Sequence, residues 1–124
     1  MYNAIVTVTD KRGLNRLIPF LWYRKFNIFS TGGTYKFIED IVNEPGNEQY
    51  KSNLHRVSEV TKFPEMLNGR VKTLHPNILG GVLASHTSQE HMNEISQHNI
   101  PNFNLVVANL YQFYTAVSIK HLMP

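Results

Sequence analysis

Short apolar runs alternate with amphipathic segments along this chain. Residues 4–8, 27–30 and 104–111 are short and largely apolar, as the buried strands of a parallel sheet are. Residues 14–25 and 35–42 carry apolar side chains at helical spacing, so each of these segments has one face that suits a core. Strands that alternate with helices predict an α/β fold with a mainly parallel central sheet flanked by helices.

The sequence pattern of some segments does not decide between alternative structures. Pro19 lies inside the first helical pattern, so that it either bends this helix or indicates a later start. Residues 55–60 are a possible third strand. Residues 78–86 are apolar but contain two consecutive glycines, and their pattern is ambiguous. The polar residues 43–53 contain a Pro-Gly turn signal and predict an exposed loop.

Residues 87–99 predict a further helix that ends before a proline. Thr87 and Glu90 have the spacing of a capping box, in which each side chain bonds the other residue's backbone N–H group. Two of the six histidines, His91 and His98, lie two turns apart in this helix. No Asp or Glu cluster of matching spacing accompanies them, so we expect no metal site.

Composition narrows the choice of partner. The 124 residues predict one domain, residues 1–124, and the net charge of +3 favours a small anionic ligand. The basic residues are scattered, so we expect no nucleic acid partner. There is no cysteine, hence no disulfide and no thiolate zinc site. We find neither a signal peptide nor an apolar run near the ~20 residues of a membrane span, and we expect a cytoplasmic protein with no membrane partner.

Polar and glycine residues follow the predicted strands, where parallel α/β sheets bind their ligands. Lys11 comes just after the first strand, and a cation at a helix start is disfavoured unless an anion shares the site. Its alternative role is a solvated charge. Residues 30–34, Ser-Thr-Gly-Gly-Thr, follow the second strand, and their glycines, N–H groups and hydroxyls suit a phosphate. The alternative for this segment is a tight turn with a threonine cap.

Residues 63–76, FPEMLNGRVKTLHP, crowd Arg70, Lys72 and His75 into a segment without a helical period. In an extended conformation Arg70 and Lys72 share one side, while Val71 faces the core. Arginine holds a planar anion with two hydrogen bonds, and a buried lysine readily transfers protons. The segment therefore predicts a ligand-holding loop, with a solvated basic loop as the alternative.

This segment, together with VTVTDKRGL, FSTGGTYK and VVANLYQF in the same order, strongly resembles the IMP cyclohydrolase domain of the bifunctional AICAR formyltransferase/IMP cyclohydrolase. The resemblance covers residues 4–117, with a longer insertion at 43–53. It implies a methylglyoxal-synthase-like three-layer α/β fold and closure of formyl-AICAR to IMP with loss of water. It also implies that no metal or cofactor is needed, and that the domain forms a homodimer.

The resemblance implies site residues as well. Lys72 and Tyr111 match residues close to the reacting base, and they are the catalytic candidates. The nucleotide-binding candidates come from four matched segments, and they are Thr9, Asp10, Lys11, Thr31, Gly32, Gly33, Thr34, Arg70, Val71, Thr73, Ala108 and Asn109.

Two departures from the family pattern bear on activity. The family's domain continues past the last matched strand, where it supplies an Asp near a Gly-Gly pair and a catalytic lysine. We therefore expect this chain to be incomplete at its C-terminal end. Gln112 also stands where the family has a proline. The alternative function is a non-catalytic nucleotide-binding or regulatory module of the same fold. Methylglyoxal synthase activity is disfavoured because its Asp-containing motifs are missing.

Overall fold

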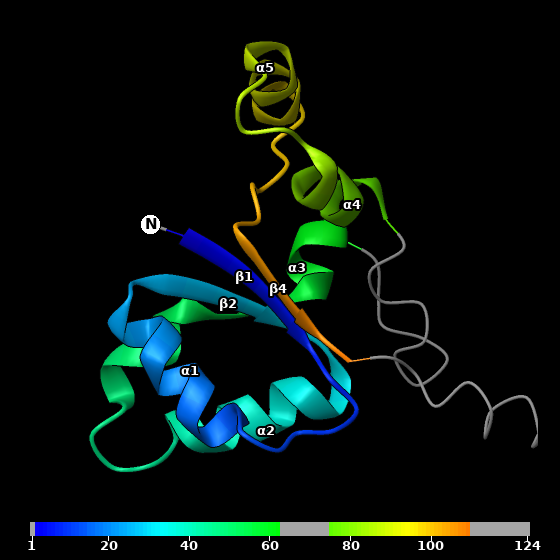
Figure 1. Cartoon of the computed structure of the whole chain (residues 1–124). Coiled ribbons are helices and arrows are strands. Elements are labelled where there is room, and N and C mark those ends of the chain that lie inside the picture. The colour runs from blue at the N-terminus through cyan, green and yellow to red at the C-terminus, as the bar shows by residue number, and fades with distance from the viewer. Residues whose placement is uncertain (1, 63–74, 110–124) are drawn as a thin grey trace, which may run out of the picture.

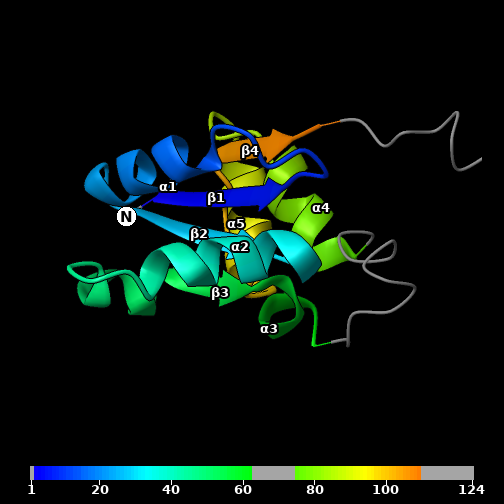
Figure 2. The same ribbon diagram turned by 90° about the horizontal axis from the view of Figure 1, so that it is seen from below.

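A four-stranded parallel sheet forms the centre of the computed structural model, which describes residues 2–62 and 75–109 (Figure 1). Its described strands are β1 (Tyr2–Thr7), β2 (Phe26–Ser30), β3 (Leu54–Arg56) and β4 (Leu105–Ala108). They lie in the order β3-β2-β1-β4, as Figure 2 shows, and every pairing between them is parallel. The predicted α/β class and the parallel sheet are confirmed.

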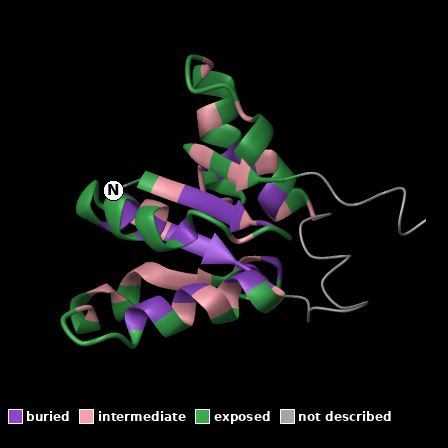
Figure 3. Cartoon of the chain, turned by 60° about the horizontal axis from the view of Figure 1, so that its bottom comes forward, coloured by how far each residue is buried: buried purple, intermediate pink, exposed green. Residues whose placement is uncertain are grey.

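Helices cover both faces of this sheet. Helices α1 (Leu14–Tyr23) and α2 (Gly32–Val42) share one core cluster with Ala4 and Val6 of β1. Helices α3 (Val57–Thr61) and α4 (Pro76–Leu83) share the second cluster with Ile5. Successive strand residues point to opposite faces, so a fully apolar strand supplies both cores. Figure 3 shows the buried residues of β1 and β2, which are consecutive from Ala4 to Val6 and from Ile28 to Ser30, between the two helical layers.

The chain reverses its direction of winding between β1 and β4. From β1 it proceeds through β2 to β3, each strand added beyond the last, and β4 then returns to the free side of β1. The carboxyl ends of β1 and β4 therefore form a topological switch point, where parallel α/β sheets open a crevice for ligands. Helix α5 (Gln89–Gln97) lies beyond the opposite, amino ends of the strands (Figure 1).

Helix α1 runs through Pro19. The helix begins at Leu14, so the alternative of a later start is wrong. Proline cannot donate to the carbonyl four residues earlier, which here belongs to Asn15. Both Pro19 and Asn15 are exposed, so the missing hydrogen bond lies on the solvent side of the helix.

The 43–53 segment is mostly exposed, as predicted, but it is more than a loop. It contains the 3₁₀ helix η1 (Glu48–Asn53), from which Tyr50 stacks on Trp22 with ring centroids 4.8 Å apart. Asn47 also donates from Nδ2 to the carbonyl of Ile41 at 2.8 Å. These contacts connect the 43–53 segment to the core around α1. The polar composition of the segment did not predict them.

Three further boundaries differ from the prediction. The possible third strand ends at Arg56, and the remaining residues form α3. The ambiguous glycine-containing segment is the helix α4, in which Gly81 lets Phe103 pack closely. The capping box of Thr87 and Glu90 is wrong, because Ser88 is the N-cap of α5 and its hydroxyl accepts from the N–H of His91 at 3.2 Å.

Candidate functional site

The ends of β1 and β4 are tied together by one asparagine side chain. Asn109 Oδ1 accepts from the backbone N–H of Thr9 at 2.7 Å and from its hydroxyl at 2.9 Å. Asn109 Nδ2 donates to the carbonyl of Asp10 at 3.0 Å. Two of the sequence-predicted segments, 9–11 and 108–109, are thus brought together at the switch point. Ala108 completes this edge as the last residue of β4, opposite Thr7 of β1.

Lys11 bends back toward the end of the second strand. Its Nζ donates to the carbonyls of Val8 at 3.2 Å and Thr9 at 3.4 Å. A Cβ atom added to Gly33 would lie 3.7 Å from this nitrogen, so the ammonium group lies against the first turn of α2. An ammonium group has three N–H donors, and two carbonyls leave one of them for an anion.

The amino end of α2 has the geometry of an anion site. Gly32 has φ of 52°, in the left-handed region that glycine enters without steric cost, directly after the N-cap Thr31. The N–H groups of Gly32, Gly33 and Thr34 have no intrahelical acceptor, because they belong to the first turn. Together with the helix dipole and Lys11, these donors favour a phosphate over a neutral group.

The hydroxyl groups of this segment have different roles. Ser30 donates to the carbonyl of Val6 at 2.6 Å. Thr34 donates to the carbonyl of Val8 at 2.8 Å and accepts from its N–H at 3.2 Å. Thr31 is only 6% exposed, and its hydroxyl has no hydrogen-bond partner among the described residues. Of the three hydroxyls expected to suit a phosphate, two therefore hold the strand ends in place and Thr31 is left for a ligand.

Asp10 forms an exposed ion pair with Arg12 beside these residues. Asp10 Oδ1 accepts from the backbone N–H of Arg12 at 3.0 Å, and the carboxylate also accepts from the guanidinium. These hydrogen bonds lower the pKa of Asp10 to about 2, and they raise the pKa of Arg12. The carboxylate is ionised at neutral pH and cannot donate a proton to a substrate. Arg12 is not among the predicted site residues, although its position two residues after Asp10 was a signal.

Five predicted site residues lie outside the described residues. They are Arg70, Val71, Lys72, Thr73 and Tyr111. His75, at the end of the basic segment, is described: its Nδ1 accepts from the N–H of Asn77 at 3.0 Å and caps α4. Its ring therefore has a structural contact at this helix start.

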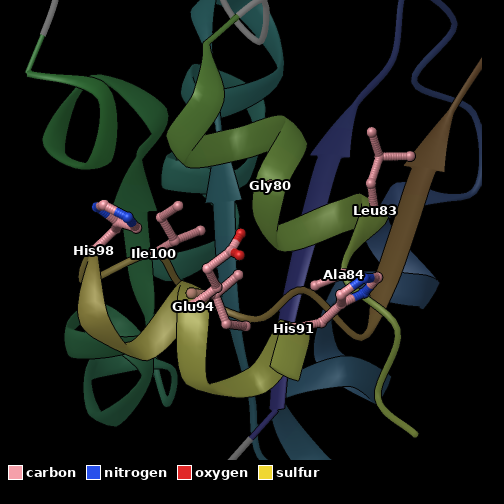
Figure 4. Close-up of a pocket in the computed structure, with 8 residues that line it drawn as sticks. Gly80, Leu83, Ala84, His91, Glu94, His98 and Ile100 are labelled. Carbon is pink, nitrogen blue, oxygen red and sulfur yellow. The ribbon is translucent and has the colours of Figure 1, made fainter. Parts of the chain in front are cut away.

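A cavity of about 220 Å³ lies between α4 and α5, away from the strand carboxyl ends (Figure 4). His91, Glu94 and His98 of α5 line it together with apolar side chains of both helices. His91 Nδ1 accepts from the N–H of Ser85 at 3.0 Å, so this ring fixes the turn before α5. Within residues 2–62 and 75–109, no group of three His, Asp or Glu side chains has the geometry to hold a metal ion. The cavity contains none of the predicted site residues.

The fold and the strand-end residues define a doubly wound α/β domain with a candidate anion site at its topological switch point. No helix in the described part of the chain has the length and apolar character to cross a membrane. Residues 16–123 match the MGS-like domain family. The chain belongs to this family, and the resemblance seen in the sequence motifs is confirmed.

Relatives of known name agree with this assignment. The chain is 41% identical over 116 residues to the bifunctional purine biosynthesis protein PurH of Fusobacterium nucleatum, covering 92% of this chain and 21% of the relative. Identity to PurH of Rhodopirellula baltica is 44% over 116 residues, covering 94% of this chain and 20% of the relative. The chain therefore spans about a fifth of the length of these proteins.

The fold is also similar to a solved structure. The crystal structure of ForH superposes with a TM-score of 0.70 at 30% sequence identity, covering 89% of this chain and 53% of that one. The superposition covers most of this chain, so the two proteins share a fold over that length.

Proposed function

We propose that this chain is a purine-nucleotide-binding domain of the IMP cyclohydrolase type, which binds formyl-AICAR and IMP and closes the second ring with loss of water. One observation carries this proposal: Lys11, the free N–H groups of α2 and the unpaired hydroxyl of Thr31 gather beside the linked ends of β1 and β4. This is the arrangement that a phosphorylated ligand requires.

The geometry suggests an orientation for the nucleotide. Its 5′-phosphate would accept hydrogen bonds at the amino end of α2, from Gly32, Gly33, Thr34 and Lys11. The nucleoside would then extend toward the crevice between β1 and β4, which Asn109 borders. Because Asn109 ties β4 to the residues after β1, one side chain sets the width of this crevice.

Ring closure needs two things from the protein. The carboxamide nitrogen and the formyl carbon must be held at contact distance, which accelerates an intramolecular attack. The tetrahedral oxygen must then leave as water, which needs proton transfer and stabilisation of charge. We assign the second task to Lys72 and Tyr111, and we assign nucleotide contacts to Arg70, Val71 and Thr73. These five assignments follow from the sequence resemblance.

The relatives support purine chemistry through their name, a bifunctional purine biosynthesis protein. No metal or cofactor takes part in the reaction that we propose. The homodimer and the cytoplasmic location stay predictions of the sequence resemblance.

Calorimetric titration with IMP and with inosine tests the binding step, and a spectrophotometric assay of formyl-AICAR closure tests the chemistry. We expect IMP to bind and inosine to bind at least tenfold more weakly. Lys11→Met removes a charge-assisted hydrogen bond of about 1.5–3 kcal/mol, so IMP affinity should fall about 10- to 150-fold. The control is Lys51→Met in η1, an exposed lysine remote from the strand carboxyl ends, which should leave affinity unchanged.

The outcomes separate the two functions that the sequence left open. Binding and turnover together support the enzyme, and Lys72→Ala should then reduce one or both at least tenfold. IMP binding without turnover would favour the non-catalytic nucleotide-binding module. If the wild-type chain bound neither IMP nor formyl-AICAR, the proposed function would be wrong.

A further inference from the structure

Arg56 lies at the carboxyl end of β3, which is on the opposite side of β2 from β1, the strand that leads to Lys11. It is the last residue of β3, and its Cα pairs with that of Ser30, the last residue of β2. Thr31, which follows Ser30 in the chain, is the N-cap of α2. Neighbouring parallel strands lie about 4.8 Å apart, so the backbone of Arg56 runs beside the start of α2. No motif in the sequence pointed to this residue.

The guanidinium of Arg56 rests on an aromatic ring of α2. Its central carbon lies 3.9 Å from the ring centroid of Tyr35. Tyr35 is in the first turns of α2, and helical side chains lean toward the helix N-terminus. The ring therefore holds the cation near the free N–H groups of this helix. A guanidinium that stacks through its face keeps its N–H donors at the edge for another partner.

The nearby carboxylate is engaged elsewhere. Glu59 Oε2 accepts from the backbone N–H of Arg56 at 3.2 Å, and it lies 3.5 Å from His55 Nδ1. Among the described residues, the guanidinium of Arg56 takes part neither in this contact nor in the ion pair of Asp10 with Arg12. Within residues 2–62 and 75–109, therefore, no carboxylate pairs with this guanidinium, and its N–H donors can bind an anion.

Two cations thus flank one helix N-terminus. Because β2 lies between β1 and β3, Lys11 reaches the start of α2 from the β1 side and Arg56 from the β3 side. The helix dipole makes both positions unfavourable for a cation unless an anion lies between them. The buried hydroxyl of Thr31, the N-cap of this helix, is a separate observation: it makes no cap hydrogen bond and has no partner among the described residues. A buried polar group of this kind is normally satisfied, and a phosphate oxygen could satisfy it.

We infer that Arg56, held in place by Tyr35, is a second cationic contact for a phosphate monoester bound at the amino end of α2. This inference rests on the proposed function and adds a residue to its phosphate site. Arg56 and Lys11 grip the phosphate from opposite sides, and the two positive charges match a group that carries about −1.5 to −2 at neutral pH. Arg56 therefore sets the preference for a phosphorylated nucleoside over the free nucleoside.

The test compares Arg56→Met with Arg56→Lys in titrations with IMP, inosine and inorganic phosphate. Arg56→Met should weaken IMP and phosphate binding about tenfold or more, because it removes hydrogen bonds between charged groups. Inosine affinity should not change, and the urea midpoint of unfolding should fall only slightly, because the contact with Tyr35 is lost as well. A loss of phosphate affinity without a loss of inosine affinity separates ligand contact from a structural role. Arg56→Lys should restore part of the affinity. The control Arg24→Met, at the exposed C-cap of α1, should bind as the wild type does.

Tyr35→Leu tests whether the aromatic ring holds Arg56 in place, because it removes the aromatic face and retains an apolar side chain. We expect phosphate affinity to fall about two- to fivefold, since exposed cation–π contacts contribute about 0.5–1 kcal/mol. If the wild type binds phosphate but not IMP, the proposed function fails, and the Arg56 variants still test the inference with phosphate. The inference is overturned if Arg56→Met binds phosphate as well as the wild type does, or if the wild type binds neither probe.

Discussion

Two threonines at the start of α2 permit a sharp test of the site. Thr31 and Thr34 are 6% and 2% exposed, and they are three residues apart. The hydroxyl of Thr34 both donates to and accepts from the backbone of Val8, whereas that of Thr31 has no partner among the described residues. Threonine and valine have nearly the same shape, so substitution by valine removes the hydroxyl and preserves the volume.

The two substitutions should affect stability in different directions. Thr34→Val leaves the buried N–H of Val8 without its acceptor, which costs about 1–3 kcal/mol of folding free energy. A loss of ~2 kcal/mol lowers the folding equilibrium constant about 30-fold. Thr31→Val removes a buried hydroxyl that already lacks a partner, so the free energy of unfolding should stay equal or rise by up to ~1 kcal/mol.

Ligand affinity should show the reverse order: Thr31→Val, the less destabilising substitution, should weaken IMP binding more. Thr31→Val removes a donor to the phosphate, and IMP affinity should fall about tenfold, as expected for a hydrogen bond to a charged group. Urea denaturation followed by circular dichroism measures stability, and calorimetry measures affinity. If Thr31→Val were as destabilising as Thr34→Val, the hydroxyl of Thr31 would have a structural partner and our reasoning about the site would be wrong.

Three further predictions follow from single contacts. Gly81→Ala should destabilise the fold by more than about 2 kcal/mol in urea denaturation, because the added Cβ would collide with the carbonyl oxygen of Pro101. Its control is Gly80→Ala, which should be tolerated because the added Cβ lies 3.2 Å from a methyl group of the Ile100 side chain. Tyr50→Ala should cost about 1–3 kcal/mol and change the fluorescence of the single tryptophan, and Tyr50→Phe should do neither. Carboxyl NMR should show Asp10 titrating near pH 2, and at a higher pH in Arg12→Ala, which loses the side-chain hydrogen bond and keeps the backbone N–H of residue 12. The lowered pKa means that this ion pair stabilises the fold above pH 4 and that its contribution is lost as the pH falls toward 2, so an unchanged titration in Arg12→Ala would contradict the assignment.

The sequence motifs predicted the residues of the candidate site more accurately than the apolar pattern predicted the helices and strands around it. Strand ends in a parallel sheet bind ligands, so a polar or glycine residue just after an apolar run is informative without any knowledge of neighbours. This reasoning selected Lys11 and the Gly32-Gly33 pair, which the structure brings into contact. It passed over Arg56, because β3 was a short and uncertain strand whose end the sequence pattern did not define.

The local pattern of apolar residues by itself determined that this chain forms parallel strands with helices between them. A strand that is buried on both faces is almost wholly apolar, and a helix that is buried on one face has apolar residues at every third or fourth position. Each of these two patterns can be recognised within a few residues of sequence. Only the tertiary structure decided that β4 lies beside β1, since a strand's own pattern does not name its partner. The hydrogen bond between Asn109 and Thr9 depends on that pairing, and the approach of Arg56 to α2 depends on the pairing of β3 with β2 and its register. They are contacts between residues distant in the chain, and for that reason no local pattern contains them.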